Sequence, residues 1–258
     1  MIRFTVVTVT YQAAAYIRRT LESVLCQTYP YVEHLIIDGC SQDETVALAN
    51  QYQLKNDQTE SLHEVIITSE PDKGLYDAMN KGLLRATGDY ILYLNAGDYF
   101  PSETTLETVA NSVGEGEELP AVLYGDTDVV DEAGNFLRHR RLSPPDKLTW
   151  KSFRHGMLVC HQAFYARTDL ARTLLYDVQY RHSADVDWCI RVMKAAEQQH
   201  LHLRNVHAVV ACFLAGGDSK KHHRESLYER FSVMRKHYGL LTTIVMHLWF
   251  VVRGVMKK

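Results

Sequence analysis

Acidic residues follow several apolar stretches of the first hundred residues, where a carboxylate could hold a cation or a nucleotide. The stretch 90–94 leads into the segment Asn95-Ala96-Gly97-Asp98. Mg²⁺ and Mn²⁺ prefer oxygen ligands such as the carboxylate of Asp98. A divalent cation there could neutralise a diphosphate leaving group and act as a Lewis acid in group transfer. Taken alone, however, this segment is more typical of a simple turn between a strand and a helix.

A second carboxylate, that of Asp38, ends another apolar run and could accept a hydrogen bond from the N–H edge of a nucleobase. Thr10 and Tyr11 likewise follow the first apolar run of the chain. Ligands of parallel α/β sheets bind at the carboxyl ends of the strands, so position favours a binding role for Asp38. For Ser41, capping of the next helix is an equally good interpretation.

The segment Pro71-Asp72-Lys73-Gly74 directly precedes an expected helix. A helix N-terminus with a lysine nearby suits a diphosphate. The alternative is that Asp72 caps the helix while Lys73 lies in solvent. Asn80 lies on the polar face of the same helix and joins Asp72 and Lys73 as a candidate nucleotide ligand.

Two acids, Asp185 and Asp187, lie in a segment that opens a later helix. A carboxylate at the start of a helix interacts with the helix dipole and stays ionised, so it could act as a general base. It could equally cap the helix, and the two acids would then divide between these roles. The histidines show no HExxH or comparable metal spacing, and His161 and His222 are only minor candidates for the site.

Apolar patterning predicts alternating strands and helices in the first half of the chain. Short runs rich in β-branched residues are typical of buried strands, and apolar side chains at helical spacing are typical of helices. This order predicts an α/β fold with a mostly parallel sheet flanked by helices. The expected strands are 4–10, 34–38, 64–69, 90–94 and 121–124, the last leading into 125–128; the expected helices are 13–27, 44–53, 75–88 and 104–112, with a polar loop at 54–62.

The overall composition is that of an ordinary globular protein. The chain has 258 residues, of which 46% are hydrophobic and 23% charged. A net charge of −3 gives no indication of nucleic acid as a partner. The five cysteines are scattered without a CxxC pair, which argues against a disulfide framework or a zinc site and favours the cytoplasm. No signal peptide is expected before the first strand.

Five segments, taken together and in this order, resemble the family 2 glycosyltransferases. The resemblance is strongest to the branch that builds bacterial surface polysaccharides, such as the colanic-acid-type transferases. It is dense over about 3–105 and thinner over 155–190. The matching segments are Thr8-Val9-Thr10-Tyr11, Ser23-Val24-Leu25-Cys26-Gln27-Thr28-Tyr29, Asp38-Gly39-Cys40-Ser41-Gln42-Asp43-Glu44-Thr45, Glu70-Pro71-Asp72-Lys73-Gly74-Leu75-Tyr76-Asp77-Ala78-Met79-Asn80-Lys81-Gly82, and Asn95 to Asp98.

The resemblance implies the GT-A fold, inversion at the anomeric carbon and a nucleotide-sugar donor, expected to be a UDP-sugar. The acceptor would be a saccharide or a lipid-linked saccharide. Asp38 would bind the nucleobase, Asp98 would hold Mn²⁺ or Mg²⁺, and Asp185 would be the base. The other implied nucleotide-sugar ligands are Thr10, Tyr11, Asp72, Lys73, Asn80, Asn95, Ala96 and Gly97.

The chain departs from the family pattern at three positions. The family usually has acids where this chain has Asn95 and Gly97, so only Asp98 remains as a carboxylate and its affinity for a metal would be modest. Ala184-Asp185 replaces the usual acidic pair at the base position. Gln12 replaces the asparagine that commonly follows Tyr11.

Two alternative functions stay open at this point. The thinned acidic motif is compatible with a nucleotide-sugar-binding protein that has lost catalysis. A nucleotidyltransferase can share a similar nucleotide-binding sheet, but it would need a phosphate loop rich in glycine and arginine after the first strand. The segment Thr10-Tyr11-Gln12-Ala13 is not such a loop.

The expected organisation is one domain, 1–218, followed by a helical tail, 219–258. Its nucleotide-sugar-binding half would be 1–105 and its acceptor half 106–218. The apolar stretch Leu240–Val252 is too short and too interrupted to span a bilayer. It could form a core helix, or lie on the inner face of the cytoplasmic membrane with Arg253, Lys257 and Lys258 near the headgroups.

Overall fold

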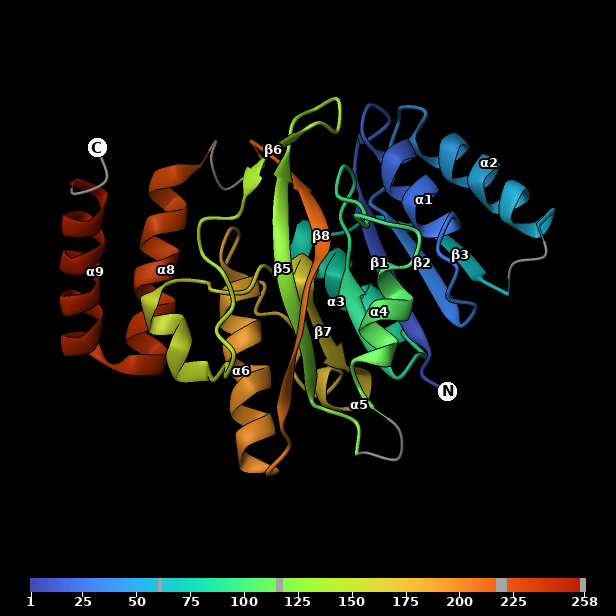
Figure 1. The fold of residues 1–258 in the computed structure, drawn as a ribbon. Coiled ribbons are helices and arrows are strands. Elements are labelled where there is room, and N and C mark those ends of the chain that lie inside the picture. Colours follow the sequence, from blue (N-terminus) through green and yellow to red (C-terminus); the bar gives the residue numbers. More distant parts are fainter. Residues whose placement is uncertain (60–61, 115–117, 217–221, 256–258) are drawn as a thin grey trace.

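The first half of the chain alternates strands and helices around four parallel strands (Figure 1). The computed structural model describes residues 1–59, 62–114, 118–216 and 222–255. β1 pairs in parallel with both β2 and β4, and β2 pairs in parallel with β3. The bounds are β1 (Phe4–Thr10), α1 (Ile17–Leu25), β2 (Val32–Asp38), α2 (Thr45–Asp57), β3 (Glu64–Ser69), α3 (Leu75–Arg85), β4 (Tyr90–Tyr93) and α4 (Thr105–Asn111).

The second half extends this sheet with antiparallel and parallel strands. The strand order is β3-β2-β1-β4-β7-β5-β6, and β8 pairs in parallel with β5. Strand β7 is antiparallel to β4 and to β5, so the sheet is mixed but mostly parallel. The bounds are β5 (Val122–Val130), β6 (Phe136–His139), the 3₁₀ helices η1 (Trp150–His155) and η2 (His161–Ala163), β7 (Phe164–Arg167), α5 (Thr168–Ala171), α6 (Ala184–Gln198), β8 (Leu203–Leu214), α8 (His223–Tyr238) and α9 (Leu240–Val255).

The predicted α/β class is confirmed, and two local predictions were wrong. The expected strand 121–124 continues through 125–128 to Val130, because β8 provides a hydrogen-bonding partner along this length. The expected polar loop 54–62 is helical up to Asp57, because the buried Asn56 side chain donates a hydrogen bond to the carbonyl of His63. The predicted domain boundary at 218 lies outside the described residues.

Alternating side chains of the central strands build a core on each face of the sheet. Along β2, Leu35 and Ile37 pack into the larger core cluster, whereas Ile36 packs into the smaller one with α1 and α2. Successive side chains of a strand point to opposite faces, so a strand buried on both faces is rich in apolar residues at successive positions. This explains why the central strands appear in the sequence as mainly apolar runs.

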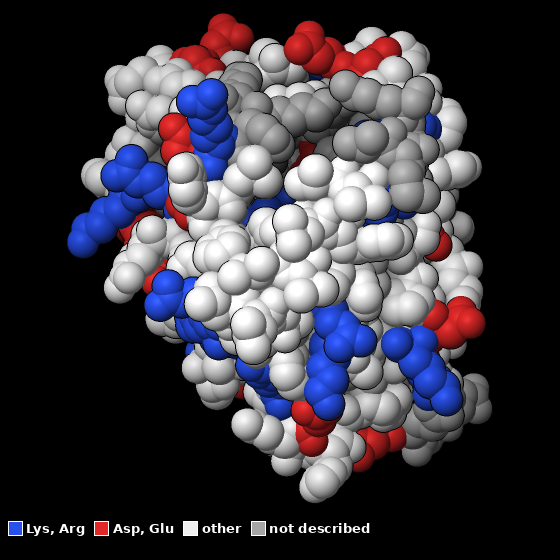
Figure 2. Space-filling model, turned by 90° about the vertical axis from the view of Figure 1, so that its left-hand side faces the viewer, with Lys and Arg blue, Asp and Glu red and all other residues white. Residues whose placement is uncertain are grey.

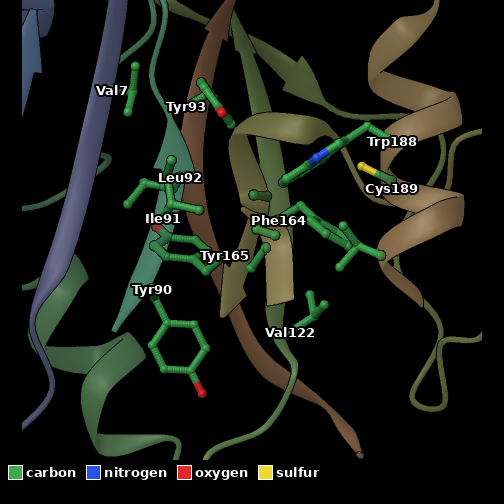
Figure 3. Close-up of a cluster of buried hydrophobic side chains, with 14 of the residues drawn as sticks. Val7, Tyr90, Ile91, Leu92, Tyr93, Val122, Phe164, Tyr165, Trp188 and Cys189 are labelled. Atoms are coloured by element: carbon green, nitrogen blue, oxygen red, sulfur yellow. The ribbon is translucent and has the colours of Figure 1, made fainter. Parts of the chain in front are cut away.

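Aromatic rings join helix α6 to the sheet in the larger core cluster. Trp188 of α6 is fully buried and makes edge contacts with Tyr93 of β4 and Phe164 of β7 (Figure 3). It also stacks on Tyr176 with ring centroids 4.8 Å apart, and Tyr176 stacks in turn on Tyr76 of α3. These contacts fix α6 against the sheet and against α3.

The C-terminal helices lie at the left of Figure 1, and of these α8 reaches the larger core cluster through Val233. Helix α8 packs between α6 and α9, with Val233 fully buried and Met234 almost so. Helix α9 packs on α8 and on η1. Among the described residues, no helix is both long and apolar enough to cross a membrane.

We expect Trp188→Ala to lower the free energy of unfolding by about 3–5 kcal/mol, because it leaves a cavity among three aromatic rings. Urea denaturation followed by far-UV circular dichroism measures this loss. The matched control is Leu84→Ala, at an exposed position of α3, which should change stability by less than about 0.5 kcal/mol. Equal stability losses for the two variants would contradict the role of Trp188.

Candidate active site

A cavity of about 730 Å³ opens at the carboxyl ends of the parallel strands. This volume is within the range of about 300–1,000 Å³ typical of small-molecule sites. Five of the residues predicted from the sequence line it, together with residues such as Gly39, Tyr16 and Leu75 that the sequence did not single out. The five are Thr10, Tyr11, Asp72, Asn95 and Ala96.

Three loops meet around Gly39 at one end of this cavity. A side chain at Gly39 would lie 2.4 Å from Oδ2 of Asp72 and 3.4 Å from the ring of Tyr11. The Tyr11 side chain is largely exposed, so one face of its ring is available to a ligand. Glycine at this position therefore lets the loops after β1, β2 and β3 approach one another.

Asp38 organises the loop after β2 rather than lining the cavity. Its carboxylate is buried and accepts hydrogen bonds from the Thr10 hydroxyl, from the Ser69 hydroxyl, and from both the backbone N–H and the hydroxyl of Ser41. Burial raises the pKa of Asp38, but the hydrogen bonds outweigh it, so the pKa lies below its ordinary value. The nucleobase contact of Asp38 stays a prediction.

Ser41 also links the first two loops, which is a different role from the cap considered above. Its hydroxyl accepts a hydrogen bond from the backbone N–H of Gln12 at 2.9 Å. Gln12 and Cys40 both adopt positive φ values, of 51° and 63°. Such conformations are uncommon outside glycine and persist when surrounding contacts enforce them. Two of them on facing loops indicate that this edge of the cavity has a fixed shape.

The segment before α3 divides between the main cavity and a neighbouring one. The Asp72 carboxylate accepts a hydrogen bond from the N–H of Gly74 and lines the main cavity. Lys73 is exposed and lines a second cavity of about 440 Å³, together with Arg181 and His182. Lys73 and Asp72 are therefore adjacent in sequence but face different hollows.

Asn80 lies on the inner side of α3, where its side-chain amide forms two hydrogen bonds with the backbone of Tyr176. Its Nδ2 donates to the carbonyl of Tyr176, and its Oδ1 accepts from the N–H of Tyr176, at 3.0 and 2.7 Å. Asn80 is buried and does not line the main cavity. The donor contact predicted for Asn80 is untested, whereas this clamp on Tyr176 is a direct feature of the structure.

The segment after β4 is split between residues that face the cavity and residues that face the protein. Asn95 and Ala96 line the cavity. Gly97 has a φ of +100°, and its N–H donates to the hydroxyl of Thr20, so it turns the chain away. Asp98 follows this turn and is 5% exposed.

The Asp98 carboxylate has a protein partner on each oxygen. Oδ2 accepts from Nε2 of Gln162 at 2.8 Å, and Oδ1 accepts from the N–H of Leu214 at 3.0 Å. Burial raises the pKa of Asp98, and these hydrogen bonds offset only part of that effect. Within the described part of the chain, no cluster of three or more His, Cys, Asp or Glu residues could hold a metal ion. Both carboxylate oxygens of Asp98 therefore have protein partners, and its role as a metal ligand stays a prediction.

Asp185 stands in the first turn of α6 with two side chains holding its carboxylate. Oδ1 accepts a hydrogen bond from the Tyr76 hydroxyl at 3.2 Å, and Oδ2 lies 3.4 Å from Nδ1 of His161. Burial raises the pKa of Asp185, but the His161 contact and the positive charge of Arg230 are among the effects that bring it below its ordinary value. Asp185 is therefore ionised at neutral pH, as a general base must be.

His161 connects this base to the cavity. Its Nε2 lies 3.2 Å from Nδ2 of Asn95, which lines the cavity, and its Nδ1 faces Asp185. A neutral ring with its proton on Nδ1 satisfies both contacts, donating toward Asp185 and accepting from Asn95. His161 is only a minor candidate from the sequence, because its partners lie 66 residues before it and 24 residues after it and no local spacing reveals them.

The second acid of the segment, Asp187, is fully buried and neutralised by cations rather than capping the helix. It accepts hydrogen bonds from Lys236 and His237 of α8, at 2.9 and 2.8 Å, and from Arg191 of its own helix at 2.6 Å. Burial raises the pKa of Asp187, but these three partners hold it well below its ordinary value. The two acids thus differ: Asp185 reaches the cavity through His161, whereas Asp187 pairs with cations inside the protein.

Helix α8 also holds the segment that leads into α6. The Glu229 carboxylate accepts one hydrogen bond from the N–H of Arg181 and one from the N–H of His182, both at 2.8 Å. His222, at the start of α8, stacks on the ring of His182. His222 therefore lies beside the loop before Asp185 and does not line the main cavity.

The fold and the site together define a GT-A glycosyltransferase. The model of the family described as "Glycosyl transferase family 2" matches residues 5–175, and the chain belongs to that family. Of the curated relatives, a PGL/p-HBAD biosynthesis glycosyltransferase of Mycobacterium tuberculosis is 35% identical over 212 residues, which are 81% of this chain and 76% of the relative. The chain is therefore a glycosyltransferase enzyme.

Solved structures share the fold at low sequence identity. TarS 1–349 of S. aureus in complex with UDP-GlcNAc has a TM-score of 0.71 at 17% identity, with 96% of this chain and 73% of that chain covered. The mannosyltransferase PcManGT of Pyrobaculum calidifontis, solved with GDP-Man and Mn²⁺, has a TM-score of 0.66 at 16% identity, with 96% and 70% covered. The chain spans only 38% of the longer TarS structure.

We expect His161→Asn to shift the acidic limb of the pH profile of kcat/KM to higher pH. If Asp185 is the general base predicted from the sequence, it must be ionised, and activity falls as the pH drops through the pKa of Asp185. His161 lowers that pKa, and its removal raises it. His139→Asn is the control, because His139 is an exposed histidine that also faces a carboxylate, that of Asp128. An unmoved limb in His161→Asn would contradict the coupling.

Proposed function

We propose that this enzyme transfers a sugar from a nucleotide-sugar donor, a UDP-sugar, to a saccharide or lipid-linked saccharide, with inversion at the anomeric carbon. The reaction would belong to the synthesis of bacterial surface polysaccharides, in the colanic-acid-type branch, at the cytoplasmic side of the cell membrane. Family membership and the sequence resemblance support the reaction class. The observation that carries the proposal is the contact chain from Asn95 through His161 to Asp185, since it joins the cavity to an ionised base.

The chemistry is a single displacement. The acceptor hydroxyl gives its proton to Asp185, its oxygen forms a bond to the anomeric carbon, and the bond from that carbon to the diphosphate breaks. The nucleoside diphosphate leaves with the electron pair of the broken bond. Such a step requires base, nucleophile and leaving group in line, which is why fixed positions of Asp185 and of the donor cavity matter.

The donor would occupy the main cavity, with its base near Tyr11 and its diphosphate near the segment before α3. Tyr11 offers an exposed ring that suits stacking on a base. Asp72 and the loop after β2 would close the base end, and Asn95 and Ala96 would lie along the sugar. Lys73 lines the second cavity with Arg181 and His182, so its contact with the nucleotide stays a prediction.

A divalent cation, Mn²⁺ or Mg²⁺, is a separate part of the proposal. It is supported by the family resemblance and by the Mn²⁺ named for the mannosyltransferase of similar fold. When bound, such an ion supplies positive charge to the diphosphate leaving group. No step described above for Asp185, Tyr76 or His161 depends on it.

We expect Asp185→Asn to lower kcat by about 10²–10⁴-fold, because the amide cannot accept the acceptor proton. Donor binding should stay near the wild-type level, since Asp185 does not line the main cavity. Product formation by chromatography and donor binding by calorimetry measure the two effects. Asp57→Asn, at an exposed aspartate near the end of α2, serves as the control. Transfer at the wild-type rate in Asp185→Asn would rule out this residue as the base.

A panel of nucleotide-sugars tests the donor class and the cation together. We expect UDP-sugars to raise the Tm more than GDP-sugars do, and Mn²⁺ to enlarge that shift, because a ligand that binds only the folded state stabilises it. The measurement is thermal denaturation with each donor, in Mn²⁺ and in EDTA. Equal shifts in Mn²⁺ and EDTA would reject the cation while leaving the donor proposal intact.

A further inference from the structure

The outer face of α9 carries a dense row of exposed apolar side chains. The inner face is packed, with Thr243 fully buried and His247 in edge contact with Phe231 of α8. Contiguous exposed apolar patches are rare on protein surfaces in contact with water, and they mark interaction sites. The exposed large apolar residues of α9 are Leu240, Leu241, Ile244, Val245, Leu248, Trp249, Val251 and Val252.

The same face of α8 extends this apolar surface. Phe231 contacts α9 through His247. Leu227 and Tyr228 lie four and three residues before Phe231, so they stand on the same side of the helix. Both are exposed, Tyr228 to 79%. We call α9 together with Leu227 and Tyr228 the apolar face.

Basic side chains lie beside α9, the main part of the apolar face, whereas exposed Glu225 lies on α8 two residues before Leu227. The sequence of α9 contains no Asp or Glu and ends near Arg253. Helix η1, which packs on α9, carries the exposed cations Lys151 and Arg154, and α8 carries exposed Arg235. Figure 2 views the molecule from this side: uncharged surface occupies the centre, Lys and Arg side chains lie beside it, and acidic side chains are visible mainly toward the edges.

From this combination we infer that the apolar face docks on a lipid bilayer with anionic headgroups. Aliphatic side chains of an interfacial helix enter the boundary of headgroups and acyl chains, while neighbouring Lys and Arg residues contact the anionic headgroups. Trp249 suits that boundary, because its ring combines an apolar body with a polar N–H. Docking on the bilayer would bring the enzyme to the lipid-linked acceptor of the proposed function. Only this link to the acceptor rests on the proposed function; the lipid binding itself does not.

A second copy of the chain is the competing occupant, and the charges argue against it. A symmetric dimer places the same patch of both subunits face to face. Because α9 contains no Asp or Glu, the cations Arg253, Lys151 and Arg154 beside one copy of the face would meet no carboxylate on α9 of the other copy. A bilayer with anionic headgroups provides the opposite charge instead.

Vesicle binding by the full chain, without donor or acceptor, tests the inference. We expect the protein to co-sediment with vesicles of phosphatidylcholine and phosphatidylglycerol, and much less with phosphatidylcholine alone. The double variant Leu241→Glu/Leu248→Glu should bind the anionic vesicles at least about tenfold more weakly, because it places two carboxylates in the apolar face. Lys151→Gln/Arg154→Gln should also weaken binding about tenfold, as two headgroup contacts are lost.

The matched control is Leu54→Glu/Leu84→Glu, which introduces the same charges at exposed leucines of α2 and α3 and should bind as the wild type does. Wild-type binding by Leu241→Glu/Leu248→Glu would overturn the inference. The inference would also be overturned if neither protein binds vesicles and sedimentation velocity shows the wild type as a dimer and this variant as a monomer. Vesicle binding is measured without sugar transfer, so a protein that does not bind vesicles leaves the transferase proposal intact. A protein that binds vesicles but transfers no sugar contradicts the transferase proposal alone.

Discussion

The parallel pairing of β1 between β2 and β4 is the constraint on which the rest of the structure depends. Thr10 pairs with Asp38 at the ends of β1 and β2, and Val7 pairs with Tyr93 at the end of β4. Because all these strands end at one edge, the loops that follow them must meet there. The cavity, the buried Asp38 carboxylate and the close approach at Gly39 are consequences of this register.

In the second half of the chain, the buried carboxylate of Asp187 in α6 is the constraint that positions the neighbouring helices. Removing a charge from water is costly unless it is paired and hydrogen-bonded. Arg191 of α6 pairs with one oxygen of Asp187, and Lys236 and His237 of α8 pair with the other. The requirement couples α8 to the helix that carries Asp185, and through α8 it connects the apolar face of α9 to the active site.

The sequence predicted features that depend on neighbours along the chain and missed those that depend on distant partners. The strands, most helices and the lining residues Tyr11, Asp72 and Asn95 follow from local apolar patterns and from position after a strand. The extension of β5 depends on β8, which lies some eighty residues later. Likewise, the contacts of His161 with Asn95 and Asp185 exist only once the sheet has formed, so residue type alone could not rank it above the other histidines.

Glu229 binds the main chain of the loop before α6, through the N–H groups of residues 181 and 182, and not their side chains. Any residue except proline supplies such an N–H. The side chain at position 181, which lines the hollow next to Lys73, can thus be changed without loss of the main-chain contact with Glu229. A main-chain contact of this kind holds the start of α6 in place whatever side chain position 181 carries.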